Sequence, residues 1–68
     1  MSTYKVVDVI GTSPTSWEDA VQSAIRDAAQ SLRHLRVAEV STLDVTLADD
    51  GTIQEYRAKV HLSIKHEG

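Results

Sequence analysis

Apolar and polar residues alternate without a break from Tyr56 to Lys65, near the end of the chain. A period of two is typical of a β-strand that packs one face on a core and exposes the other. The apolar set consists of Tyr56, Ala58, Val60, Leu62 and Ile64, and the set between them of Arg57, Lys59, His61, Ser63 and Lys65. The apolar face predicts packing against a helix, because no other segment is available to cover it.

A longer period governs the middle of the chain. Across 17–35 the apolar residues recur every three or four positions, which predicts an amphipathic helix. Two residues compete to cap its start: Ser13, which is followed by a proline, and Ser16, which has Asp19 three positions later. The helix is expected to end near His34, where basic residues suit the negative end of the helix dipole.

Two further β-rich segments complete the pattern. Tyr4–Ile10 predicts a first strand, and Val37–Ala48 predicts a second that a turn at Asp49-Asp50-Gly51 joins to the last. The order strand, helix, strand, strand places residues 1–68 in a single α+β domain. If the last strand also lies beside the first, the fold is a three-stranded antiparallel sheet wrapped on one helix.

Strict alternation along the second strand predicts a mixed face on the side away from the helix. That face would carry Val37, Glu39, Ser41, Leu43, Val45 and Leu47. A mixed apolar face on a small two-layer domain indicates a contact between subunits.

Composition narrows the class of protein. With 68 residues the chain lies near the lower limit for independent folding, and without cysteine it has no disulfide to compensate. Self-association, or a cation held by oxygen ligands, is therefore expected to supply the missing stability. The net charge of −3 and the lack of a basic face argue against nucleic-acid binding. No apolar run approaches the roughly 20 residues of a membrane span, and no signal segment is evident. A cytoplasmic protein is therefore expected.

Three motifs resemble the dodecin family. They are Arg36–Val40, Tyr56–Val60 and the Gly11–Pro14 turn, and the resemblance extends over nearly the whole chain. Flavin-binding dodecins carry a tryptophan that stacks on the flavin ring and a glutamine that hydrogen-bonds it. Here those positions are Val37 and Arg57, so the resemblance implies the scaffold without the flavin clamp.

The resemblance implies a homo-oligomer of twelve subunits that forms a hollow shell and binds a small molecule or cation. Gly11–Glu18 and the Val37/Arg57 pair are most similar to the calcium dodecin branch of the family. Calcium is therefore the first expected ligand, with Asp8, Glu18 and Asp19 as its candidate ligands because they flank the Gly11–Trp17 part of the shared segment. A flavin, FMN or riboflavin, in an altered site is one alternative, and a structural assembly without a specific ligand is another.

Little in the chain indicates catalysis. The three histidines lack the spacing of metal ligands, and no acid is expected beside His61 and Ser63, so a nucleophilic enzyme is disfavoured. Trp17 is expected to pack within the fold. Arg57 is expected either to pair with an acid such as Glu39 or Glu55 or to contact a ligand.

Overall fold

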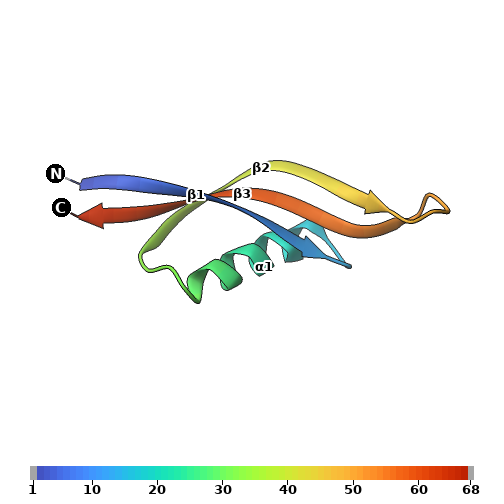
Figure 1. Cartoon of the computed structure of the whole chain (residues 1–68), viewed down its shortest axis with the longest axis horizontal. Helices are drawn as coiled ribbons and strands as arrows, with labels where there is room; N and C mark the ends of the chain where they lie inside the picture. The colour runs from blue at the N-terminus through green and yellow to red at the C-terminus, as the bar shows by residue number, and fades with distance from the viewer. Residues whose placement is uncertain (1, 68) are drawn as a thin grey trace.

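The computed structural model describes residues 2–67 and contains one helix and three strands. In chain order these are β1 (Ser2–Ser13), α1 (Trp17–Ala29), β2 (Leu35–Leu47) and β3 (Ile53–Glu67). The strands form one antiparallel sheet in the order β1-β3-β2, with α1 on one face (Figure 1). The α+β fold predicted from the sequence is confirmed, and so is the central position of the last strand.

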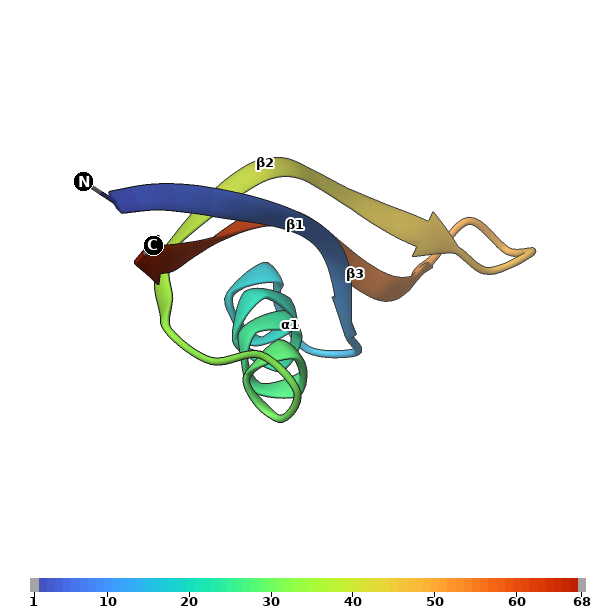
Figure 2. The ribbon, with the colours of Figure 1, turned by 60° about the vertical axis from the view of Figure 1, so that its left-hand side comes forward.

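The core lies between α1 and the middle of the sheet, which curves around the helix (Figure 2). Ala58, Val60 and Leu62 of β3 are fully buried, as their alternation predicts. Three alanines of α1 face them, four residues apart, and their small side chains let the helix approach the sheet closely. The helix covers β1 and β3 and scarcely touches β2. Consequently β2 lacks a covering layer within the subunit.

The helix starts at the second of the two predicted caps. Ser16 is the N-cap, and its hydroxyl accepts a hydrogen bond from the Asp19 amide at 3.0 Å. Ser13 ends β1 instead and is buried; its hydroxyl donates to the Asp19 carboxylate at 2.7 Å and accepts from the Thr15 amide at 3.0 Å. Both serines therefore stabilise the strand-to-helix turn, from different positions.

The helix ends earlier than the apolar spacing predicts, at Ala29 and not near His34. The Ala28 carbonyl accepts the amides of both Ser31 and Leu32, which closes the last turn. His34 then takes φ = 63°, a left-handed conformation that a right-handed helix excludes. The cause is tertiary, because the chain must reverse within these residues for β2 to pair with β3.

Irregular pairing of β2 with β3 places the residues of the predicted mixed face on both sides of the sheet. The register shifts between Val40 and Thr42, so Ser41 is an extra residue and the alternation changes parity there. Val37 and Glu39 lie on the helix-free face, whereas Leu43 pairs with Ala58 and lies on the helix side. The single mixed face predicted by strict alternation is therefore wrong. A bulge inverts the inward and outward positions of every residue beyond it.

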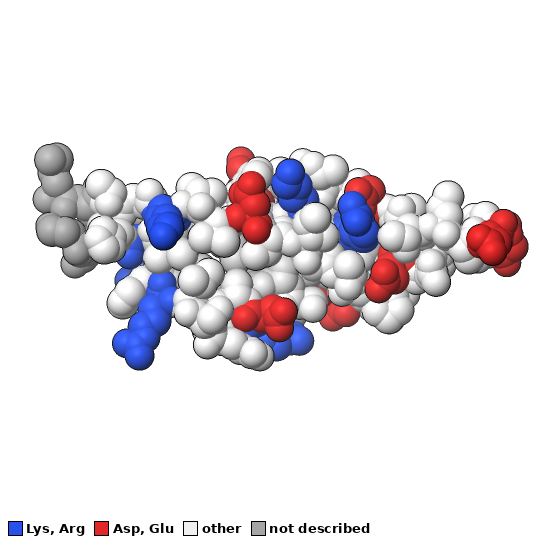
Figure 3. Space-filling view, viewed as in Figure 1, with Lys and Arg blue, Asp and Glu red and all other residues white. Residues whose placement is uncertain are grey.

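The β2–β3 hairpin projects beyond the helix and makes the subunit long and narrow, 53 × 20 × 15 Å (Figure 1). Its tip is the predicted turn: Gly51 has φ = 87°, and its amide donates to the Ala48 carbonyl at 2.9 Å. Acidic side chains gather at this tip, and the charged side chains visible toward the opposite end are basic (Figure 3). No helix within residues 2–67 combines the length and apolar character that crossing a bilayer requires.

Candidate functional site

The two positions that the family resemblance singles out share one face of the sheet. Val37 pairs with Ser63 and Arg57 pairs with Asp44, all on the helix-free side. Ser63 and Arg57 are six residues apart on β3, which corresponds to about 20 Å along a strand. One subunit therefore does not bring Val37 and Arg57 together. A single small ligand can contact both only if two subunits contribute.

Arg57 is engaged by an acid that the sequence did not single out. Its Nε donates to Asp44 Oδ1 at 2.7 Å and its second amino group donates to Oδ2 at 3.1 Å, a two-pronged pair between directly opposed residues. These hydrogen bonds lower the pKa of the Asp44 carboxyl and raise the pKa of Arg57. Pairing with an acid was the correct interpretation, but the hydrogen-bonded partner is Asp44. Glu55 contributes only a weaker Coulombic attraction, and Glu39 lies opposite His61. Cross-strand register, which sequence spacing does not show, selects Asp44.

Trp17 holds Asp44 from the helix. Its indole N–H donates to the Asp44 backbone carbonyl at 2.9 Å, and its ring meets Tyr56 edge-to-face with 5.2 Å between centroids. Trp17 therefore packs against the sheet as predicted, although its side chain remains 40% exposed in the isolated subunit. Asp44 is fixed through its carbonyl by α1 and through its carboxylate by β3. The guanidinium of Arg57 is therefore held by Asp44 within the same subunit.

The three candidate calcium ligands lie in two places. Asp8 projects from β1 on the helix-free face, where it pairs with His61. Glu18 and Asp19 are adjacent in the first turn of α1, and together with Ser16 and Gln22 they line a surface hollow of about 170 Å³. Among the side chains that the structure describes, those of residues 3–66, no three His, Cys, Asp or Glu are arranged to hold a metal ion. Each subunit thus presents incomplete sets of oxygen ligands.

The structure corrects the expectation that no acid accompanies His61. The Nδ1 atom of His61 hydrogen-bonds the Asp8 carboxylate, and Glu39 lies opposite His61 on the other neighbouring strand. The predicted central position of the last strand could have revealed these acids, because a residue on a central strand has cross-strand neighbours on both sides. A carboxylate that holds one ring nitrogen fixes the ring orientation. Orientation alone does not make Ser63, two residues along, a nucleophile.

Comparison with known proteins places the chain in a family. The family model described as Dodecin matches residues 3–67. The calcium dodecin of Mycobacterium tuberculosis is 48% identical over 65 residues, covering 96% of this chain and 90% of that protein. The dodecin of Thermus thermophilus is 34% identical over 64 residues, covering 94% and 91% respectively.

Solved structures agree with this placement. The structure of dodecin from Streptomyces coelicolor has a TM-score of 0.91 at 33% identity and covers 98% of this chain and 94% of its own. The M. tuberculosis calcium dodecin, described as calcium chelating with a novel calcium-binding site, has a TM-score of 0.83 at 45% identity and covers 96% and 91%. Dodecins are small, non-catalytic binding proteins, which confirms the expectation that the chain is not an enzyme. The chain belongs to the dodecin family.

Proposed function

We propose that the chain is a self-assembling binding protein whose ligand is calcium or another small cation. The observation that carries this proposal is the state of the two flavin positions. Val37 offers no aromatic face for stacking, and both prongs of Arg57 are taken by Asp44. A calcium dodecin that is 48% identical over almost the whole chain supports the cation in place of flavin.

The hollow at the start of α1 is the favoured part of the cation site. Its lining side chains, Ser16, Glu18, Asp19 and Gln22, all carry oxygen atoms, the ligands that calcium prefers. Asp8 is less suited within one subunit, because it pairs with His61 on the helix-free face and does not line this hollow. Calcium takes six to eight oxygen ligands. The two carboxylates of one hollow therefore require water molecules or a second subunit to complete the coordination shell of the calcium ion.

Calcium is expected to raise the melting temperature of the assembled protein at pH 7 and to have little effect at pH 4. Binding to the folded state stabilises it by RT ln(1 + [Ca²⁺]/Kd), about 2.7 kcal/mol when calcium exceeds Kd a hundredfold. At pH 4 protons compete for the carboxylates and weaken the site. Calorimetric titration and thermal unfolding at both pH values measure the effect, with magnesium as a comparison ion.

A matched pair of double variants locates the calcium site. Glu18→Gln/Asp19→Asn should abolish most of the calcium-dependent stabilisation, and the amides preserve shape and the acceptor for Ser13. The control, Asp27→Asn/Asp49→Asn, removes the same amount of negative charge elsewhere and should retain the calcium-dependent stabilisation. If millimolar calcium produces neither heat nor a melting shift in the unmodified protein, a structural assembly without a specific ligand becomes the better conclusion.

Assembly follows from the apolar surface that the subunit leaves uncovered. Val40 and Leu43 lie on the helix side of β2, yet they are 45% and 48% exposed because α1 does not reach them. β2 is also an edge strand with free backbone groups. Among the residues that the structure describes, six apolar side chains are buried, and four of them are alanines, so the subunit gains little from its own core. Burying this patch against other copies would supply the missing stability.

The intact protein is expected to have about twelve times the 7.5 kDa subunit mass, as dodecins form dodecamers. Native mass spectrometry and light scattering measure this at micromolar concentration. Leu43→Asp should dissociate the assembly, because it introduces a charge into the apolar patch. Thr42→Asp adds the same charge to the neighbouring position, which faces the other side of the sheet, and should disturb assembly less. A stable monomer or dimer of the unmodified protein would contradict the proposal.

A further inference from the structure

The hairpin tip between β2 and β3 contains a peptide bond that can rearrange chemically. Asp50 is followed by Gly51, and no other aspartate of the chain precedes a glycine. An aspartate side chain can be attacked by the backbone nitrogen of the next residue, and a glycine there hinders the attack least because it has no Cβ. The chain contains no asparagine, whose side chain reacts in the same way. The sequence therefore places this chemistry at one position, in an exposed turn.

The rearrangement is a cyclisation followed by a hydrolysis. The Gly51 nitrogen forms a bond to Asp50 Cγ, one carboxyl oxygen leaves as water, and a five-membered succinimide ring results. A water molecule then opens the ring. Its attack on the side-chain carbonyl restores aspartate, whereas its attack on the backbone carbonyl gives isoaspartate, in which the main chain runs through the side chain. One water is lost and one is gained, and the first step requires a neutral carboxyl because an ionised carboxylate is a poor electrophile.

Hydrogen bonds within the turn hold both reacting groups. Asp50 Oδ1 accepts from the Thr52 amide at 3.0 Å and from the Thr52 hydroxyl at 2.7 Å, an arrangement typical of aspartate in turns. The Gly51 amide donates to the Ala48 carbonyl at 2.9 Å, so the attacking nitrogen is engaged as well. The Thr52 hydroxyl and, after it, the Thr52 amide lower the pKa of the Asp50 carboxyl, because they donate to its ionised form. The folded turn therefore disfavours the neutral carboxyl that cyclisation requires.

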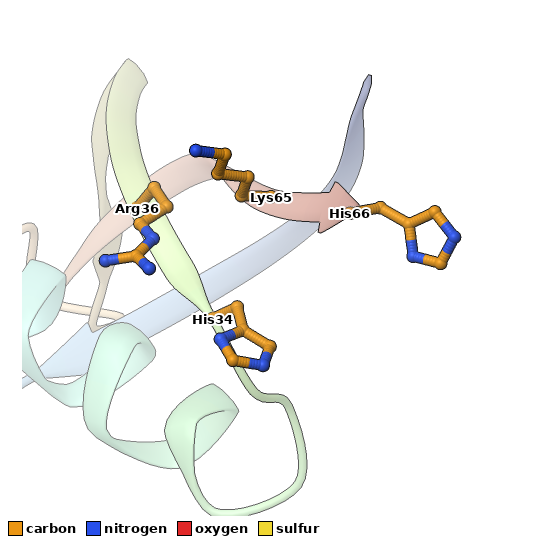
Figure 4. A pocket seen from close by; sticks show the side chains of 4 residues that line it. All are labelled: His34, Arg36, Lys65 and His66. Carbon is orange, nitrogen blue, oxygen red and sulfur yellow. The ribbon is translucent and has the colours of Figure 1, made fainter. Parts of the chain in front are cut away.

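The hairpin tip receives no restraint from the rest of the described chain. Nothing lies within 4 Å of the position that a Cβ atom would take at Gly51. The two salt bridges of the described residues lie elsewhere on the sheet. At the opposite end of the subunit, where β2 begins and β3 ends, a hollow is lined by basic residues: His34, Arg36, Lys65 and His66 (Figure 4). The carboxylate of Asp50 is consequently held by Thr52 and by no basic side chain among the described residues.

We propose that the Asp50–Gly51 bond is the site at which this chain forms isoaspartate, and that Thr52 suppresses the reaction while the hairpin is folded. Isoaspartate adds one methylene group to the main chain, so the turn could not keep the present hydrogen bond between Gly51 and Ala48. The register of a hairpin depends on its turn. By suppressing the reaction, Thr52 preserves the pairing of β2 with β3. The tip shares no residue with the hollow at the start of α1, so the proposal stands or fails independently of calcium binding.

Ageing of the intact protein at pH 7 tests the proposal. Trypsin releases residues 37–57 as one peptide, and chromatography coupled to mass spectrometry separates its aspartyl and isoaspartyl forms, which have equal mass. The full chain unfolded in guanidinium chloride should form isoaspartate about tenfold faster than the folded protein, because the turn's hydrogen bonds are absent. Thr52→Val keeps the shape and the amide but loses the hydroxyl, and it should raise the rate in the folded protein about fivefold. Thr52→Ser keeps both donors and should stay within about twofold of the unmodified protein.

Gly51→Ala identifies the reacting bond, because in the unfolded chain its methyl group should hinder the attacking nitrogen and slow the reaction severalfold. Equal rates in the folded and the unfolded protein would overturn the protection by the turn. Equal rates for Thr52→Val and Thr52→Ser, in proteins with the same circular dichroism, would exclude the Thr52 hydroxyl as its source. Isoaspartate that forms chiefly at Asp44 or Asp49 of the same peptide would contradict the assignment of the site.

Discussion

Gly11→Ala is expected to destabilise the protein by about 3 kcal/mol or more, which is a large part of the stability of so small a domain. A Cβ atom at position 11 would lie 2.0 Å from the Ala20 carbonyl oxygen and 2.9 Å from the Ala24 Cβ. Both are parts of α1, and the first is backbone, so no flexible side chain can move aside. The whole helix would have to shift away from β1, which opens the core that Ala20 and Ala24 share with β3.

A second glycine provides the control for this prediction. Gly51→Ala also adds one methyl group, but nothing lies within 4 Å of its Cβ position, and only the φ of 87° opposes the change. Its expected cost is about 1–2 kcal/mol. Urea unfolding monitored by circular dichroism compares the two variants with the unmodified protein. Equal stabilities for the two variants would contradict the close packing of α1 against β1.

Val37→Trp together with Arg57→Gln is expected to create riboflavin binding in a protein that otherwise lacks it. The indole supplies a stacking face worth roughly 1–3 kcal/mol by analogy with nucleobases, and the amide supplies a hydrogen bond to the ring edge. Arg57→Gln also leaves the Asp44 carboxylate without the two hydrogen bonds that it accepts from Arg57. Because the two positions are far apart within a subunit, the gain should appear only in the assembled protein. Quenching of riboflavin fluorescence measures the affinity.

The two single variants should each bind riboflavin more weakly than the double variant, because each supplies one part of the site. Val6→Trp with Arg57→Gln is the matched control. Val6 and Val37 flank Ser63 on the same face of the sheet, so both variants expose one new indole there. Equal affinity in the control would show that any exposed tryptophan suffices. Micromolar riboflavin binding by the unmodified protein would show that the missing tryptophan does not decide the ligand.

Local sequence signals were sufficient for most of the fold. The alternation from Tyr56 to Ile64, the three-to-four spacing across α1 and the turn before Gly51 each depend on residues close together in the chain. Family motifs then identified Val37 and Arg57 as the informative departures from flavin-binding relatives. They could not identify the partner of Arg57, since Asp44 lies on another strand.

Only the tertiary structure decided how these elements are placed against one another. The parity change at Ser41, the Asp8–His61 contact and the convergence of His34 and Arg36 with the end of β3 depend on strand register. Register is set by pairing between residues far apart in sequence, and one bulge reverses which side chains share a face. The early end of α1 has the same origin. The helix ends early because the chain must turn back for β2 to pair with β3, and no local sequence pattern indicates where that turn has to lie.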